Sequence, residues 1–111
     1  MDELRKERLA INEALFRNVN EGLRAGQAVA GHRLTVRCEC GALGCNRMFE
    51  IDAALYESVR ANPRRFVLLK GHDVPAVERV VERHGAFDVV EKVGASGDIA
   101  DVTDPRGRGS A

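Results

Sequence analysis

The chain has 111 residues, 44% of them hydrophobic and 31% charged, which are ordinary values for one soluble globular domain. Its 17 basic and 17 acidic residues cancel to a formal net charge of zero. This removes the simplest electrostatic argument for a dedicated binder of nucleic acid or of anionic membranes. No apolar run approaches the roughly 20 residues that a membrane span needs, and the charged N-terminus lacks the apolar core of a signal peptide. We therefore predict a cytoplasmic protein.

The N-terminal segment predicts one amphipathic helix over residues 2–25. Its apolar positions recur at intervals of four and seven, and charged residues fill the opposite side. The stripe comprises Leu4, Ile11, Leu15, Val19 and Leu23. Asn12, Asn18 and Asn20 are unusual for a purely solvated helix: either they contact the rest of the fold or a partner, or they are ordinary surface residues. A loop over residues 25–31 follows.

A β-hairpin is predicted next. Residues 33–40 alternate between apolar and polar side chains, as a half-buried strand does, and residues 47–51 form a second short strand. Asp52 suits the N-cap of a helix over residues 53–62, and Pro63 ends that helix.

The second half of the chain predicts two further strands with a helix between them. Residues 65–70 (RFVLLK) are nearly continuously apolar, which is typical of a central strand covered on both faces. A helix is predicted over residues 74–84, because Pro75 suits its first turn and Gly85 its end. Residues 87–93 form the last strand, and the glycine-rich and charged segment 95–111 predicts a flexible C-terminal tail.

Together these elements predict a mixed α+β fold in a single domain over residues 1–94. It comprises an N-terminal helix, a hairpin that carries the cysteines, and two βα units. About four strands share one mixed sheet, and the last three are expected to be parallel because helices join them.

All three cysteines lie in CECGALGC, residues 38–45. An odd number of thiols does not suit a closed disulfide framework, and clustered cysteines in the cytoplasm more often bind metal or perform redox chemistry. Cys38 and Cys40 point the same way along an extended strand, and a turn at the glycines that follow delivers Cys45. Three such thiolates favour Zn²⁺, which takes about four ligands at tetrahedral corners. The alternatives are small buried hydrophobic side chains or a redox centre.

His72 is the preferred fourth ligand. It directly follows the RFVLLK strand, where chain ends converge on a sheet edge, and Asp73 beside it can orient the imidazole. The other candidates are His32, His84 and Glu39, of which His84 is explained more simply as a cation at a helix C-terminus. A closed set of Cys38, Cys40, Cys45 and His72 leaves no open coordination position, which predicts a structural zinc site.

Residues 11–93 resemble a group of small, uncharacterised bacterial proteins. The shared pattern comprises Asn12-Glu13, Phe16-Arg17, Val19-Asn20-Glu21, Cys38-Glu39-Cys40, Cys45, Tyr56-Glu57, Val59-Arg60, Pro63, Phe66 and Gly71-His72. This resemblance implies the same cysteine and histidine set and no particular activity.

The hairpin also resembles the SWIM zinc finger, in which a Cys-x-Cys pair is followed by Cys-x-His. Cys38 and Cys40 match the first pair and Cys45 the third ligand, whereas Arg47 stands where the histidine would be. The resemblance implies binding of DNA or protein. Zinc-dependent cytidine deaminases are excluded, because the Pro-Cys-x-x-Cys motif of that family is absent.

The sequence therefore predicts a small zinc-binding protein that is an interaction or regulatory module with an unidentified protein partner, rather than an enzyme. It contains no P-loop and no GxGxxG motif. Three alternatives stay open. A thiol switch would use Arg37 and Arg47 to lower the pKa of the thiols, and a zinc-dependent enzyme would require His72 not to ligate. Nucleic-acid binding would use Arg60, Arg64, Arg65 and Lys70, with Tyr56 and Phe66 nearby.

Overall fold

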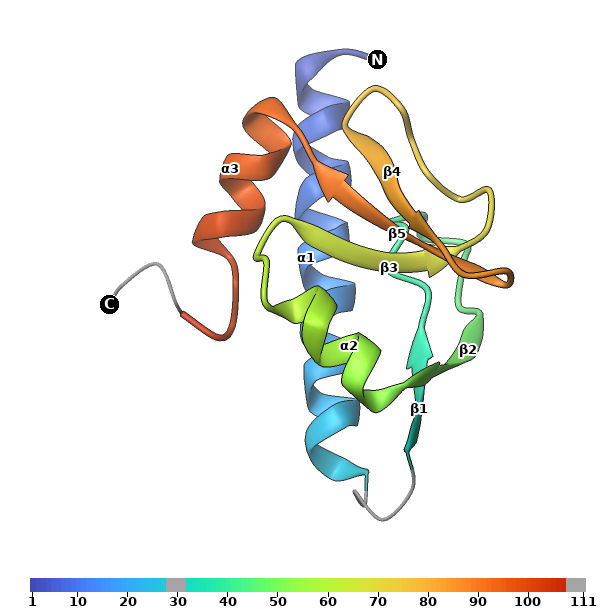
Figure 1. The fold of residues 1–111 in the computed structure, drawn as a ribbon. Helices are drawn as coiled ribbons and strands as arrows, with labels where there is room; N and C mark the ends of the chain where they lie inside the picture. The colour runs from blue at the N-terminus through green and yellow to red at the C-terminus, as the bar shows by residue number, and fades with distance from the viewer. Residues whose placement is uncertain (28–31, 108–111) are drawn as a thin grey trace.

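The computed structural model describes residues 1–27 and 32–107, which form three helices and two small antiparallel sheets (Figure 1). The elements in chain order are α1 (Glu3–Gly26), β1 (Arg33–Arg37), β2 (Met48–Asp52), α2 (Ala53–Arg60), β3 (Arg65–Leu69), β4 (Glu78–Arg83), β5 (Phe87–Lys92) and α3 (Gly94–Val102). The predicted α+β class with an N-terminal helix is confirmed. Most of the predicted loop, at residues 28–31, lies outside the described residues. None of the described helices is long and apolar enough to cross a membrane.

β1 and β2 form the predicted hairpin, in which Leu34 pairs with Ile51 and Val36 with Phe49. Alternate side chains of a strand share one face, so Leu34, Val36 and Ile51 are buried together in a core cluster. Asp52 ends β2 and caps α2, because its carboxylate accepts the Ala54 N–H at 2.8 Å.

The remaining strands form a second sheet in the order β3-β5-β4, with antiparallel neighbours throughout. The predicted helix over residues 74–84 is wrong, because a short turn leads into β4 over Glu78–Arg83. Val77, Val80 and Val81 do have helical spacing, but β-branched side chains favour a strand when a partner strand is available. β5 supplies that partner.

The strands are therefore arranged differently from the single mixed sheet that the sequence suggested. Five strands lie in two sheets, and the described residues contain no parallel pair. β4 and β5 are joined by a hairpin turn, which permits the antiparallel pairing. RFVLLK does not supply the central strand of its sheet; β5 is central, and β3 has one edge without a strand partner.

α3 occupies part of the segment that was predicted to be a flexible tail from residue 95 to residue 111. It packs against α1 and buries Ala100. Arg64 pairs with Asp98 and Asp101 on its outer side. The prediction is wrong for this part of the chain because the GASGD run has a low helix propensity and its partners are far away in sequence. Residues 108–111 lie outside the described part of the chain.

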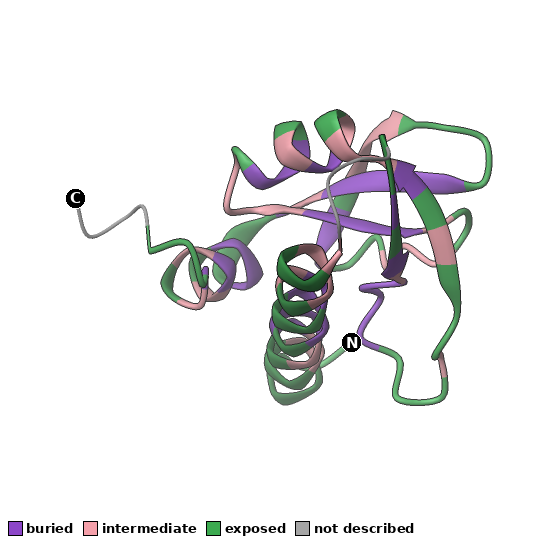
Figure 2. Cartoon of the chain, turned by 90° about the horizontal axis from the view of Figure 1, so that it is seen from below, coloured by how far each residue is buried: buried purple, intermediate pink, exposed green. Residues whose placement is uncertain are grey.

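α1 does not pack against the fold through its predicted apolar stripe. An apolar stripe normally marks the buried side of a helix, but here the stripe residues Leu4, Ile11, Leu15 and Val19 are 41 to 66% exposed. Figure 2 shows α1 nearly end-on, with its exposed residues on the side away from the sheets. The buried side instead carries Glu13, Arg17 and Asn20 together with Ala10, Ala14 and Phe16.

The buried polar residues of α1 contact distant parts of the chain. Arg17 donates hydrogen bonds to the carbonyl oxygens of Pro63 and Ala100. Glu13 joins Lys92 and Glu78 in a buried ionic cluster. These partners are tens of residues away in sequence, so the pattern within the helix does not reveal them.

Candidate metal centre

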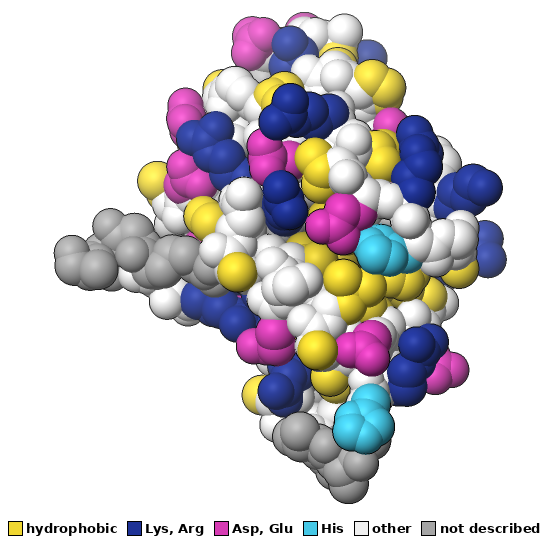
Figure 3. Space-filling model, viewed as in Figure 1, with side chains coloured by type: hydrophobic (Ala, Val, Ile, Leu, Met, Phe, Trp, Pro, Cys, Tyr) yellow, Lys and Arg dark blue, Asp and Glu magenta, His cyan; other side chains and the backbone are white. Residues whose placement is uncertain are grey.

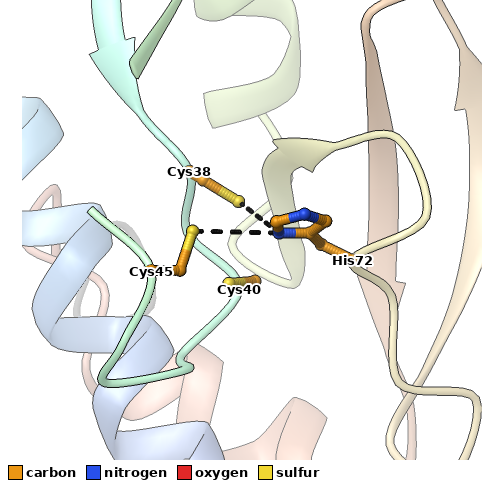
Figure 4. A group of neighbouring side chains, drawn as sticks. All are labelled: Cys38, Cys40, Cys45 and His72. Carbon is orange, nitrogen blue, oxygen red and sulfur yellow. Dashed lines mark hydrogen bonds between the residues drawn. The ribbon is translucent and has the colours of Figure 1, made fainter. Parts of the chain in front are cut away.

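Four possible ligand atoms gather where the cysteine segment meets the turn after β3. The Sγ atoms of Cys38, Cys40 and Cys45 and a ring nitrogen of His72 all lie within 4.8 Å of one another. The Nδ1 atom of His72 is 3.5 Å from Cys38 Sγ and 3.8 Å from Cys45 Sγ, and its ring faces both sulfurs (Figure 4). Bond lengths of about 2.3 Å to sulfur and 2.0 Å to nitrogen place tetrahedral ligands roughly 3.5 to 3.8 Å apart. The group can therefore hold a metal ion.

The cysteine segment reaches His72 by lying along the free edge of β3. The Glu39 N–H donates to the Val67 carbonyl oxygen at 3.0 Å. The Glu39 carboxylate accepts a hydrogen bond from the Val67 N–H at 2.9 Å. This side chain therefore takes the place of the backbone carbonyl group that a neighbouring strand would supply. These bonds cover the open edge of the sheet. They also hold the end of β3, and the turn that carries His72, beside the thiols.

Each sulfur accepts a hydrogen bond from a backbone N–H. Leu69 donates to Cys38 at 3.2 Å, Ala42 donates to Cys40, and Arg47 donates to Cys45. Donors of this kind stabilise thiolates and orient metal ligands. Sequence reasoning missed the particular donors because they depend on the backbone path, and the two glycines of the loop were the only local signal.

Two asparagines of α1 hold the cysteine segment from the other side. Asn20 accepts the Arg37 N–H at 2.7 Å and donates to the Arg37 carbonyl oxygen at 2.9 Å and to Glu39 Oε2 at 2.7 Å. Asn12 donates to the Gly41 carbonyl oxygen at 3.2 Å. Of the two interpretations of these asparagines, contact with the fold therefore holds for Asn12 and Asn20, whereas Asn18 is exposed.

The other candidates for the fourth ligand lie elsewhere. The Glu39 carboxylate is bonded to Asn20 and Val67, and burial raises its pKa to about 7 despite those hydrogen bonds. His84 is not at a helix end; it follows β4, and its Nε2 is 2.8 Å from Glu82. His32 is exposed just before β1. Among the described residues, only His72 joins the three thiols in a metal-competent group.

Comparison of the chain with protein-family models, curated proteins and solved structures finds no significant match. The resemblances to the small bacterial proteins and to SWIM zinc fingers stay predictions. The metal-competent group is defined by the geometry of its own residues.

The three thiols differ in acidity. Burial raises the pKa of Cys38 to about 12, and it raises the pKa of Cys40 as well. Cys45 is half-buried, and although that burial opposes ionisation, hydrogen bonds from the Arg47 N–H and from the other two thiols lower its pKa. The charge of Arg37 also lowers it. A divalent cation offsets the desolvation of buried thiolates, so metal binding is the chemistry that suits Cys38 and Cys40.

Gly41 is the residue of this loop that tolerates a side chain least. Its φ is +76°, and a Cβ there would lie 2.7 Å from Leu9 Cδ1 and 2.8 Å from Glu13 Cγ. We expect Gly41→Ala to lower the free energy of unfolding by about 1 to 3 kcal/mol, measured by urea denaturation. Gly44→Ala is the matched control, because nothing lies within 4 Å of its Cβ position and no left-handed φ applies there. Equal losses in both variants would contradict this explanation.

Proposed function

We propose that the chain is a small zinc-binding protein with a structural Cys3His site, and that it acts as a non-enzymatic interaction or regulatory module. The supporting observation is the gathering of three sulfurs and one imidazole nitrogen within 4.8 Å. Thiolate and imidazole ligands in a tetrahedral arrangement suit Zn²⁺, whereas Mg²⁺ and Ca²⁺ take oxygen ligands. Cys38, Cys40, Cys45 and His72 would hold the ion.

A structural role fits the surroundings of the site better than catalysis does. Four protein ligands leave no position for a water molecule or a substrate. The carboxylate next to the thiols in sequence, Glu39, is bonded to Asn20 and Val67, so it is not placed to act as a general base beside the metal.

The metal would join parts of the fold that share no strand pairing. Cys38, Cys40 and Cys45 lie between the strands of the hairpin, whereas His72 follows β3 in the other sheet. Leu43, in the loop between the ligands, is 81% exposed. If the metal fixes this loop, a protein partner can bind the exposed leucine at a lower entropic cost, because the loop is already ordered.

Metal analysis of protein purified without chelator tests the proposal. We expect one equivalent of zinc in the wild type and little in Cys45→Ser and His72→Ala. His84→Ala is the matched control, because it removes a histidine outside the site and should keep its zinc. Zinc-free wild-type protein with full thermal stability would overturn the proposal. A cobalt-substituted site that takes a fifth ligand or a water would point to an enzyme instead.

One observation favours a second function, a thiol switch. Cys45 is half-buried whereas Cys38 and Cys40 are buried, so Cys45 is the thiol that an oxidant reaches first. With hydrogen peroxide as oxidant, two thiolates and two protons would give one disulfide and two molecules of water, and the metal would leave. Zinc release by one equivalent of peroxide, followed with a chromogenic chelator, would support the switch. Retention of zinc would count against it.

The basic residues that suggested nucleic-acid binding are mostly engaged by carboxylates. The ion pairs join Arg60 to Glu21 and Asp104, Arg64 to Asp98 and Asp101, and Arg65 to Glu82 and Glu91. Figure 3 shows acidic and basic side chains intermingled on the viewed face. Paired cations gain less from contact with phosphate, so we do not propose nucleic acid as the partner.

A further inference from the structure

The outward side of α1 carries an apolar stripe that the described chain leaves exposed. Leu4 is 66% exposed, Ile11 51%, Leu15 55% and Val19 41%. Single exposed hydrophobic residues are common, but a row of them along one helix face marks an interaction surface. The other side of α1 packs against the fold through both polar and apolar residues, among them Arg17 and Phe16, so the exposed stripe is not needed for the core of the described chain.

A glycine in the same face indicates what covers the stripe. Gly22 lies within α1, where glycine is less favourable than alanine, and nothing lies within 4 Å of its Cβ position. Its φ is not in the left-handed region. Neither the backbone nor the packing of the described chain therefore requires glycine there. A bulky side chain from another molecule would explain it.

We propose that α1 pairs with α1 of a second copy of this chain, antiparallel and about a two-fold axis. One register places Leu4 of each copy opposite Gly22 of the other, and Ile11 opposite Leu15. The most exposed side chain of the stripe then faces a residue with no side chain, and the two central residues of the stripe face each other. A two-fold interface requires a surface that is complementary to itself in this way.

The charges of the helix select the antiparallel arrangement. Glu7 and Arg8 are both exposed in the second turn of α1. A parallel two-fold pair would bring Arg8, which lies on the stripe side of the helix between Leu15 and Val19, close to its own copy, and like charges repel. The antiparallel register instead places Arg8 opposite Asn18, which is exposed and uncharged.

The size of the stripe sets the strength of the pairing. A helix of 24 residues spans about 36 Å, and a strip about 10 Å wide on each copy buries on the order of 700 Å² in total. Stable complexes bury about 1,200 to 2,000 Å². We therefore expect a reversible dimer with a dissociation constant in the micromolar range. The inference is independent of the metal, because α1 contacts the cysteine segment through its opposite side.

Sedimentation of the full zinc-loaded chain between about 1 and 500 µM tests the proposal. The wild type should pass from monomer to dimer across this range. Leu15→Glu should raise the dissociation constant at least about tenfold, with zinc content and melting temperature of the monomer unchanged because the side chain is exposed. Leu43→Glu is the matched control, since it charges an exposed leucine outside the stripe and should leave the dimer intact.

Two further variants test the register. Gly22→Leu should stabilise the monomer, because leucine favours a helix, and should weaken the dimer by filling the space opposite Leu4. Leu4→Cys mixed with Gly22→Cys should form the mixed disulfide in preference to either homodisulfide. Wild-type protein that stays monomeric at every concentration would overturn the proposal, as would a dimer that Leu15→Glu leaves unchanged. Preferential homodisulfides would overturn the antiparallel register.

Discussion

We expect removal of zinc by a chelator to lower the midpoint of thermal unfolding by about 20 °C. Metal binding supplies about 10 to 16 kcal/mol in isolated zinc-finger peptides. This chain also has two core clusters, one of which includes Cys38 and Cys40, so the loss should be smaller, on the order of 5 kcal/mol. For a chain of 111 residues each kcal/mol shifts the midpoint by about 4 °C.

The loss of structure on removal of the metal should begin at the contact between the cysteine segment and β3. The amide protons of Glu39 and Leu69 are both bonded across this contact. Their hydrogen exchange should therefore accelerate on chelation. The amides of paired Val80 and Val90, between β4 and β5, serve as the internal reference and should keep their protection.

A variant separates the effect of the metal from that of the chelator. Without chelator, Cys45→Ser should already show the low midpoint of thermal unfolding that is expected for chelated wild type. Adding chelator should not lower the midpoint of this variant further. If chelated wild-type protein, shown to be free of metal, melts at the same temperature as the loaded protein, the site does not stabilise this fold.

The second large effect is expected at the buried ionic cluster, where Lys92→Met should lower the free energy of unfolding by about 3 to 5 kcal/mol. The Lys92 ammonium contacts both Glu13 and Glu78. The exposed fraction is 1% for the Lys92 side chain and 0% for each glutamate side chain. Its loss would leave two carboxyl groups together without a cation in a site that excludes water. Urea denaturation at fixed pH measures the effect.

Glu13 makes the same cluster sensitive to pH. Burial, together with the nearby Glu78, raises the pKa of Glu13 from 4.5 to about 9, although Lys92 opposes the shift. Between these values the folded state holds a proton that the unfolded state releases. The stability that Glu13 contributes is therefore complete below its unfolded pKa and is lost as the pH rises toward 9, by up to about 1.4 kcal/mol per pH unit.

Glu13→Gln should flatten this dependence, because an amide replaces the carboxyl group without a proton to lose. Denaturation between pH 5 and 9 should show a shallower fall in stability for the variant than for the wild type. Glu7→Gln, on the exposed side of α1, makes the same change in charge and should keep the wild-type slope. Parallel curves for the wild type and Glu13→Gln would show that Glu13 does not titrate in this range.

Local sequence patterns were sufficient to predict several parts of the fold and to choose the candidate metal ligands. The alternation of residues 33–40 identified a strand, which the structure forms over Arg33–Arg37, and Asp52 identified the start of α2, because strand periodicity and N-capping act over a few residues. The three cysteines are close in sequence, so a metal group that contains them was predictable from spacing. His72 was chosen from its place after a strand, and the structure places it beside the thiols.

Predictions that depended on distant partners failed. The valines of β4 suit either a helix or a strand, and pairing with β5 decides between them. α3 is stabilised by contacts with α1 and by Arg64, and its own composition gives no such signal. The buried side of α1 was not predictable from polarity, because the partners of Glu13, Arg17 and Asn20 lie elsewhere in the chain.

The amino-acid sequence by itself determined the α+β class, the hairpin and the set of three thiols and one histidine, since each depends on a short-range pattern or on residue chemistry. Only the tertiary structure decided which side of α1 is exposed and that Glu39 covers the edge of β3. The physical reason is that burial of a polar group is favourable only where a partner completes its hydrogen bonds. Those partners are brought close only when the whole chain folds.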